Sequence, residues 1–160
     1  MDDVDTGRMK RVLDRLYDRP AEDRGERRPP KTPGDDACGL LRRERELYGL
    51  LAEIGRRSGA CRGALQGVLR RSGARQRRLR ADCFLAPGGE WPEGPPPPRP
   101  RTGVLSALGL AVRELEALEE GYAHAGARQP RDRETYGRFA RECRSDSEKM
   151  RALLERAMGS

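Results

Sequence analysis

The chain has 160 residues, of which 37% are charged, 35% hydrophobic and 4% aromatic, and its formal net charge is +7. This length allows one domain with a core, while 19 glycines and 12 prolines indicate that part of the chain is irregular and solvated. Apolar runs are too short to span a membrane, and the N-terminus lacks the apolar core of a secretory signal, so a cytoplasmic protein is expected.

Residues 1–37 are predicted to form an N-terminal arm outside the domain. Apolar residues recur at helical spacing within residues 5–18, which predicts a short amphipathic helix that docks on the domain or on a partner. Residues 19–36 contain four prolines and no apolar periodicity, so they are interpreted as a disordered linker. The domain is therefore expected at residues 38–160.

Four long amphipathic helices are predicted in this domain, which is expected to be all-α because no segment alternates apolar and polar residues as a strand would. Asp35 and Asp36 are suitable N-cap residues for the first helix, and a Ser-Gly break at 58–59 separates it from the second. Helices joined so tightly are expected to be antiparallel. The first helix is predicted at 38–57, the second up to 85, the third at 103–127 and the fourth at 131–158.

The segment between the second and third helices, residues 89–102, contains six prolines. It cannot be a helix or a central strand, because proline lacks the backbone N–H that both structures use. We interpret it as a proline-rich crossover that spans the length of the bundle. A role as an extended ligand for aromatic grooves stays open.

The second helix is the most basic part of the chain. Residues 58–85 contain seven arginines and one aspartate, whereas residues 103–127 contain one arginine and four glutamates. Because 30 of the 33 basic residues are arginine, this excess also fits the composition bias of a GC-rich genome. The charge alone leaves nucleic-acid binding as an alternative without a recognisable reading motif. The candidate basic surface consists of Arg62, Arg70, Arg71, Arg77, Arg78 and Arg80.

The four cysteines, Cys38, Cys61, Cys83 and Cys143, are widely separated and form no Cys-x-x-Cys pair. Zinc knuckles and rubredoxin-type iron sites need paired thiolates, so neither is expected. The last three lie on apolar helix faces, where a thiol is usually a small buried hydrophobe. Disulfides stay possible, but the expected cytoplasmic location argues against them.

Four segments of the predicted helices carry a family resemblance. They are RRLRADCFLAPG at 77–88, LRRERELYGLLA at 41–52, AVRELEALEEGY at 111–122 and FARECRSDSEKMRALLERAM at 139–158. The first resembles the end of the second helix in rubrerythrin-like proteins of the ferritin-like superfamily, and the others are similar to that family's first, third and fourth helices. The resemblance implies a ferritin-like four-helix bundle. It also implies a di-iron site with Glu from two helices and Glu-x-x-His from the other two.

Several of the implied ligands are missing from this chain. In the second helix, Ser72 stands where the matching Glu would be and Arg75 where the His would be. In the fourth helix, the His position falls on Ser145. The vestigial candidate ligands that remain are Glu44, Glu114 and Glu142. Since arginine carries a permanent positive charge, Arg75 is expected to pair with one or more of these glutamates, which replaces a metal centre by a salt-bridged core.

The expected function is non-enzymatic, with no catalytic residue, metal or other cofactor. The protein is expected to act as a structural or protein-interaction module, and its partner would be another protein or a second copy rather than a membrane. Two alternatives stay open: a residual metal-binding protein in iron or redox handling, with iron held by the three glutamates, and an Arg-rich nucleic-acid-associated bundle. The one histidine, His124, lies near the end of the third helix, where a surface or capping role is expected.

Overall fold

A computed structural model describes residues 36–86, 94 and 102–159 of the chain. The predicted helix of the N-terminal arm and its linker up to residue 35 lie outside the described residues. Most of the proline-rich segment lies outside them as well.

The described residues are all-α, as predicted. Their four long helices are α2 (Ala37–Arg57), α3 (Gly59–Leu85), α4 (Val104–Arg128) and α5 (Arg133–Met158), and a short 3-10 turn, η2 (Pro130–Asp132), leads into α5. These bounds agree with the predicted helices to within two residues. None of the helices in this part of the chain is long and apolar enough to cross a membrane.

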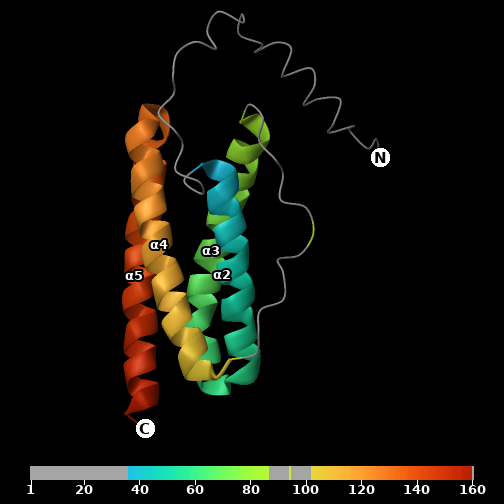
Figure 1. Cartoon of the computed structure of the whole chain (residues 1–160), viewed down its shortest axis with the longest axis vertical. Helices are drawn as coiled ribbons and strands as arrows, with labels where there is room; N and C mark the ends of the chain where they lie inside the picture. Colours follow the sequence, from blue (N-terminus) through green and yellow to red (C-terminus); the bar gives the residue numbers. More distant parts are fainter. Residues whose placement is uncertain (1–35, 87–93, 95–101, 160) are drawn as a thin grey trace, which may run out of the picture.

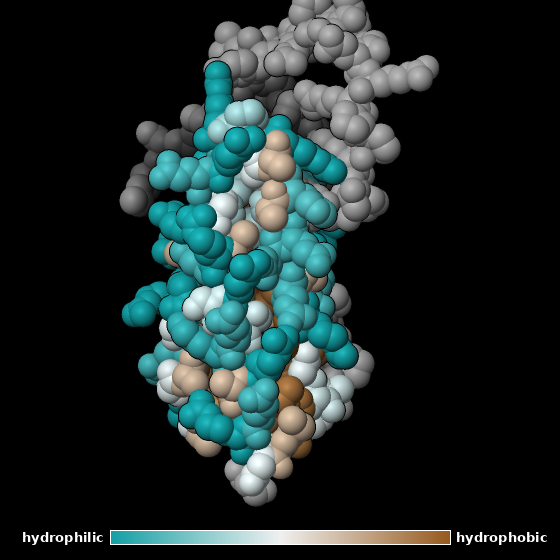
Figure 2. Space-filling view, turned by 90° about the vertical axis from the view of Figure 1, so that its left-hand side faces the viewer, coloured by the Kyte–Doolittle hydropathy of each residue, from teal (hydrophilic) through white to brown (hydrophobic). Residues whose placement is uncertain are grey.

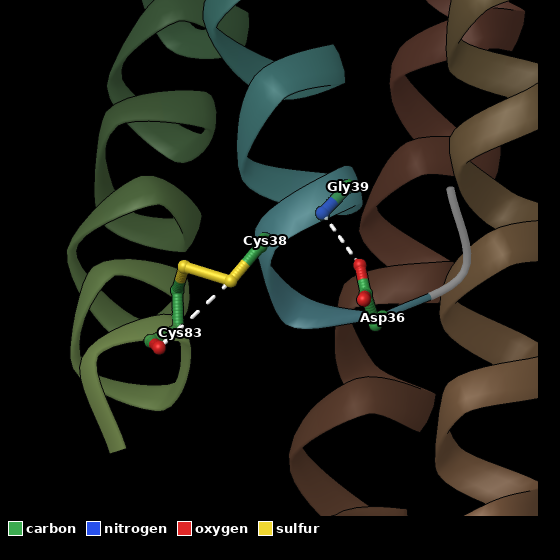
Figure 3. The surroundings of a disulfide bond; sticks show 4 residues. All are labelled: Asp36, Cys38, Gly39 and Cys83. Carbon is green, nitrogen blue, oxygen red and sulfur yellow. Dashed lines mark hydrogen bonds between the residues drawn. A yellow bond between two sulfur atoms is a disulfide. The ribbon is translucent and has the colours of Figure 1, made fainter. Parts of the chain in front are cut away.

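The start of α2 is fixed by its N-cap residue, Asp36. The carboxylate of Asp36 accepts a hydrogen bond of 2.7 Å from the backbone N–H of Gly39 (Figure 3). This bond satisfies one of the donors that the first turn of a helix leaves without a partner. Only Ser58 separates the end of α2 from the start of α3, so the chain has to turn back at once.

The helices form two antiparallel pairs, α2 with α3 and α4 with α5 (Figure 1). The pairs pack on each other through α2 against α4 and through α3 against α5. Residue contacts fix the directions, because Glu44 near the start of α2 contacts Tyr122 near the end of α4. All four of these neighbouring pairs are antiparallel (Figure 1). The last residues of α3 and the first residues of α4 therefore lie at opposite ends of the bundle.

Two described residues between α3 and α4 lie along α2. The carbonyl oxygen of Gly94 accepts a hydrogen bond from Arg45 in the middle of α2, and that of Thr102 accepts one of 2.6 Å from Arg57 at the end of α2. Gly94 has a φ of 74°, a backbone conformation that glycine adopts without steric cost.

The core is made mainly of leucine and small residues from all four helices, with one aromatic group toward one end. Tyr122, Tyr136 and Phe139 pack together there, and the rings of Tyr122 and Phe139 meet edge to face with centroids 5.3 Å apart. The outer side of α4 and α5 is mostly hydrophilic, and its apolar side chains gather toward the lower end (Figure 2). This distribution is typical of amphipathic helices around one core.

A disulfide joins Cys38 in the first turn of α2 to Cys83 in the last turns of α3 (Figure 3). The two Cα atoms are 4.9 Å apart although the residues are 45 positions apart in sequence. The expectation that disulfides are disfavoured was therefore wrong for this pair. It rested on the inferred compartment, whereas the antiparallel pairing of α2 and α3 brings the two thiols together. Cys61 and Cys143 are buried free thiols, as expected.

Candidate functional site

The centre of the bundle holds a buried arginine, Arg75 of α3, whose side chain is completely shielded from solvent. Its Nε donates a hydrogen bond of 2.5 Å to Oε1 of Glu44 on α2, and its Nη2 lies 3.4 Å from Oε2 of the same carboxylate. Glu44 is equally buried. The two charges therefore face each other in a two-point contact without water around them.

The carboxylate of Glu44 accepts two further hydrogen bonds, one from α3 and one from α4. Ser72 on α3 donates to Oε2 at 2.7 Å, and the hydroxyl of Tyr122 on α4 donates to Oε1 at 2.6 Å. Gln76 in turn donates to the hydroxyl of Ser72 at 3.5 Å. Within the described residues, every buried side-chain nitrogen and oxygen has a hydrogen-bond partner. Glu44 thus joins α2, α3 and α4 through one fully used carboxylate.

Arg75 also reaches α5, where it meets two more carboxylates. Its Nη1 lies 3.3 Å from Oε2 of Glu142 and 3.7 Å from Oδ2 of Asp146. Asp146 is completely buried and accepts hydrogen bonds of 2.9 and 3.2 Å from Nε of Arg71. The central cluster therefore contains two guanidinium groups and three carboxylates contributed by α2, α3 and α5.

The same pattern continues toward the end of α3. Arg78 bonds the carboxylate of Asp82 through Nε at 3.1 Å and that of Asp132 in η2 through Nη2 at 2.8 Å. The hydroxyl of Tyr136 on α5 donates to Asp82 at 2.6 Å. Together with the Arg71 and Arg75 contacts, these bonds make a polar seam between α3 and the η2–α5 segment.

Burial and charge shift the proton affinities of this cluster. Burial disfavours the charged form of Arg75, but the Glu44 carboxylate and its hydrogen bond outweigh that penalty and raise the pKa of Arg75 above its ordinary value. Burial, followed by the charge of Glu44, raises the pKa of Tyr122 well above 10, so its hydroxyl stays a donor. Burial likewise raises the pKa of Cys143, which keeps this thiol neutral and unsuited to nucleophilic attack.

The structure brings together four of the residues singled out from the sequence: Glu44, Ser72, Arg75 and Glu142. Ser145 is exposed on α5 and does not face them. The inward pair spaced three residues apart on α5 is Cys143 and Asp146, one residue later than the pair predicted from the resemblance. This one-residue difference rotates the predicted positions by about 100° around the helix.

Glu114 is also placed differently from the prediction. It is half-buried on α4 and, among the described residues, makes no ion pair with Arg75. The contacts of Glu119 with Arg144 and of Tyr122 with Phe139 set residues 118–122 level with the central part of α5. The α4 residue that reaches the cluster is Tyr122, which lies about two helical turns after Glu114.

Two residues of the cluster, Asp146 and Tyr122, were not predicted as site residues, and Arg71 was predicted in a different role. Tyr122 lies in the apolar stripe of its helix, where its hydroxyl gives no signal of a polar site. Asp146 follows Glu142 by four residues, so both can reach the same neighbouring helix, a spacing that could have indicated it. Arg71 was assigned to the basic surface.

Of the six arginines in the predicted basic surface, two pair with acidic residues and four are exposed to solvent. Arg71 and Arg78 bind acidic residues in the polar seam. The other four predicted residues, Arg62, Arg70, Arg77 and Arg80, are exposed on α3. His124 is exposed near the end of α4.

No group of three or more His, Cys, Asp or Glu side chains in the described residues is arranged to hold a metal ion. The three clustered carboxylates face a guanidinium between them, and both oxygens of Glu44 and of Asp146 accept hydrogen bonds. This donor set does not fit the di-iron centre of the resembled family. Comparison of the chain with known protein families, with characterised proteins and with solved structures found no match.

Proposed function

We propose that this protein is a ferritin-like bundle that acts as a structural or protein-interaction module without a metal centre and without catalysis. The observation that carries the proposal is the completely buried guanidinium of Arg75, held by carboxylates from α2 and α5 in the middle of the bundle. In this proposal, a permanent cation with its own carboxylate partners replaces the two metal ions that bridge the helices in the resembled family.

The order of the helices supports the ferritin-like part of the proposal. Two antiparallel pairs in which α3 ends opposite the start of α4 need one long connection along the bundle, which is the feature that separates ferritin-like bundles from simple up-down bundles. Gly94 and Thr102, which bond to the middle and the end of α2, fit a crossover along that helix.

The competing proposal is a residual metal-binding protein that uses Glu44, Glu114 and Glu142. It requires Glu114 to enter the cluster, although the α4 residue there is Tyr122 about two turns away, and it requires Arg75 to leave its carboxylates. Removing one partner of a buried ion pair leaves an uncompensated charge and is strongly unfavourable. The metal-free proposal therefore requires fewer movements of side chains from their observed positions than the metal-binding proposal.

Metal analysis separates the two proposals. Full-length protein produced in iron-supplemented medium and purified without chelator is expected to contain iron, manganese and zinc far below one atom per chain. Its thermal unfolding midpoint is expected to be the same with ferrous iron as with EDTA. Stoichiometric metal that disappears in the Glu44→Gln variant would overturn the metal-free proposal.

The partner is proposed to be another protein or a second copy of this chain. Leu105 at the start of α4 and Met158 at the end of α5 are exposed apolar side chains at the same end of the bundle. Sedimentation velocity at several protein concentrations tests self-association. A monomer at every concentration leaves a different protein as the partner.

We also propose a cytoplasmic location. The Cys38–Cys83 disulfide argues against this location, because structural disulfides persist mainly in oxidising compartments. Alkylation of thiols in cells lysed under denaturing conditions, which expose the buried Cys61 and Cys143, decides the question. Two blocked thiols per chain indicate that the disulfide exists in the cell, and four indicate a reduced, cytoplasmic protein.

A further inference from the structure

The net charge of the described bundle lies on one helix pair. Helices α2 and α3 carry twelve arginines and four acidic residues, whereas α4 and α5 carry nine basic and nine acidic residues. The α3 helix accounts for most of this difference, since it has seven arginines and a single acidic residue, Asp82. The positive potential is therefore concentrated on the side of the molecule that α3 forms.

Three arginines of α3 lie on its outer face and are directed to solvent. Arg70, Arg77 and Arg80 are exposed, and none of them has an ion-pair partner among the described residues. No acidic residue occurs between Gly59 and Ala81. We name these three arginines the α3 basic face.

The residues around this face have small or short side chains. Gly63, Ala74 and Ala81 are exposed on the same side of α3, and a Cβ atom added at Gly63 would meet nothing within 4 Å. The arginines consequently project beyond their small neighbours, so an extended anionic ligand can approach the helix backbone closely. Arg70 and Arg77 are seven residues apart, which separates their Cα atoms by about 10.5 Å along the helix.

The chemistry of the face favours nucleic acid over an acidic protein. Stable protein interfaces usually need buried apolar or aromatic anchors, and none is exposed on α3 before Leu85 at its end. Interfaces with nucleic acid are polar and strongly positive, and arginine binds phosphate in a two-point geometry. The face also lacks the aromatic side chains on which single-stranded bases stack, so a duplex fits better.

We propose that Arg70, Arg77 and Arg80 bind the phosphate backbone of duplex nucleic acid without reading its bases. This goes beyond the proposed function, because it concerns the outer face of α3 and holds whether or not the bundle core ever binds metal. Three phosphate contacts predict a slope of about −3 for log K against log salt concentration.

Fluorescence anisotropy of full-length protein with a labelled 20-base-pair duplex of random sequence tests the proposal between about 20 and 200 mM salt. Binding is expected to weaken steeply with salt and to be stronger than binding to a single strand of the same length. The Arg70→Ala/Arg77→Ala/Arg80→Ala variant is expected to lose at least tenfold in affinity at the lowest salt and to reduce the slope by about three.

A matched control removes the same charge elsewhere. Arg113, Arg128 and Arg141 are exposed on α4 and α5, and their triple alanine variant lowers the net charge equally. It is expected to bind the duplex like the wild type, and circular dichroism melts verify that both variants are folded. Equal loss in both variants, no duplex binding at the lowest salt, or tighter binding of a polyglutamate peptide than of the duplex would each overturn the proposal.

Discussion

Arg75 and Glu44, both completely shielded from solvent, form an ion pair between α3 and α2 with 2.5 Å between Nε and Oε1. A buried pair of this kind is weak support for stability by itself, because desolvation of two charges offsets much of their attraction. Here the remaining oxygens and nitrogens are also bonded, to Ser72, Tyr122 and Glu142. The pair therefore fixes how three other side chains meet. The contributions of Arg75 and Glu44 to the free energy of unfolding are expected to be coupled.

Replacement of Arg75 by methionine is expected to lower the free energy of unfolding by about 3–5 kcal/mol, because it leaves the Glu44 carboxylate buried without its cation. The double variant Glu44→Leu/Arg75→Met is expected to recover part of this loss, because the unpaired charge is removed while the buried hydroxyls of Ser72 and Tyr122 lose their acceptor. Urea denaturation monitored by circular dichroism measures both.

The surface pair of Arg144 and Glu119 provides the control for this cycle. Arg144 is largely exposed, so Arg144→Ala is expected to change the free energy of unfolding by less than about 1 kcal/mol. A double variant at positions 44 and 75 that is no more stable than Arg75→Met alone would show that the two residues are not energetically coupled.

Adjacent arginines on α3 give a second comparison. Arg71 binds the completely buried Asp146, whereas Arg70 is exposed. Arg71→Ala is expected to lower the free energy of unfolding by about 1.5–3 kcal/mol, because a buried carboxylate loses its main donor while water still reaches the partly exposed arginine site. Arg70→Ala is expected to change it by less than about 0.5 kcal/mol. Equal changes in the free energy of unfolding for Arg71→Ala and Arg70→Ala would contradict a stabilising role of the Arg71–Asp146 pair in the polar seam.

The helices could be predicted from the sequence because apolar residues recur along each one at the helical period. The family resemblance also placed Ser72 and Arg75 at ligand positions of α3 and predicted that Arg75 pairs with glutamates, as it does with Glu44 and Glu142. The positions on α4 and α5 could not be fixed, because a shift of one residue rotates a side chain by about 100° and a shift of four moves it one turn along the bundle. Tyr122 and Asp146 consequently contact the cluster from α4 and α5, whereas Glu114 and Ser145 do not pair with Arg75.

The disulfide could not be predicted for a different reason. The predicted antiparallel helices place Cys38 and Cys83, which are 45 positions apart, at the same end of the helix pair, but they do not fix whether the two thiols come within bonding distance. Only the three-dimensional packing selects this pair over the other pairings that four cysteines allow.

Alkaline pH is expected to destabilise the fold. Burial raises the pKa values of Cys143, Tyr122 and Tyr136 in the folded state, so each group keeps its proton at a pH where the unfolded chain has released it. The stability that these groups contribute is fully present below their unfolded pKa values, about 8.5 for cysteine and 10 for tyrosine, and is lost as pH rises beyond them.

Urea denaturation at intervals from pH 7.5 to 10.5 measures this dependence. The free energy of unfolding is expected to stay level to about pH 8.5 and then to fall by about 1.4 kcal/mol per pH unit for each group that the unfolded chain has deprotonated. Cys143→Ala is expected to reduce the decrease in the free energy of unfolding that begins near pH 8.5. Tyr122→Phe is expected to reduce the decrease above about pH 10. Stability that rises with pH in this range would contradict the protonated core.

The last prediction concerns the covalent link between α2 and α3. Replacing both Cys38 and Cys83 by serine is expected to lower the free energy of unfolding by about 4 kcal/mol, because the disulfide closes a long loop and restricts the unfolded chain. Differential scanning calorimetry of the wild type with and without dithiothreitol should show the same loss, provided that the reductant reaches the buried bond. Dithiothreitol is expected to leave the double serine variant unchanged, since its remaining cysteines, Cys61 and Cys143, are already free thiols. A wild-type midpoint that does not move after mass spectrometry has verified complete reduction would show that packing alone holds the two helix ends together.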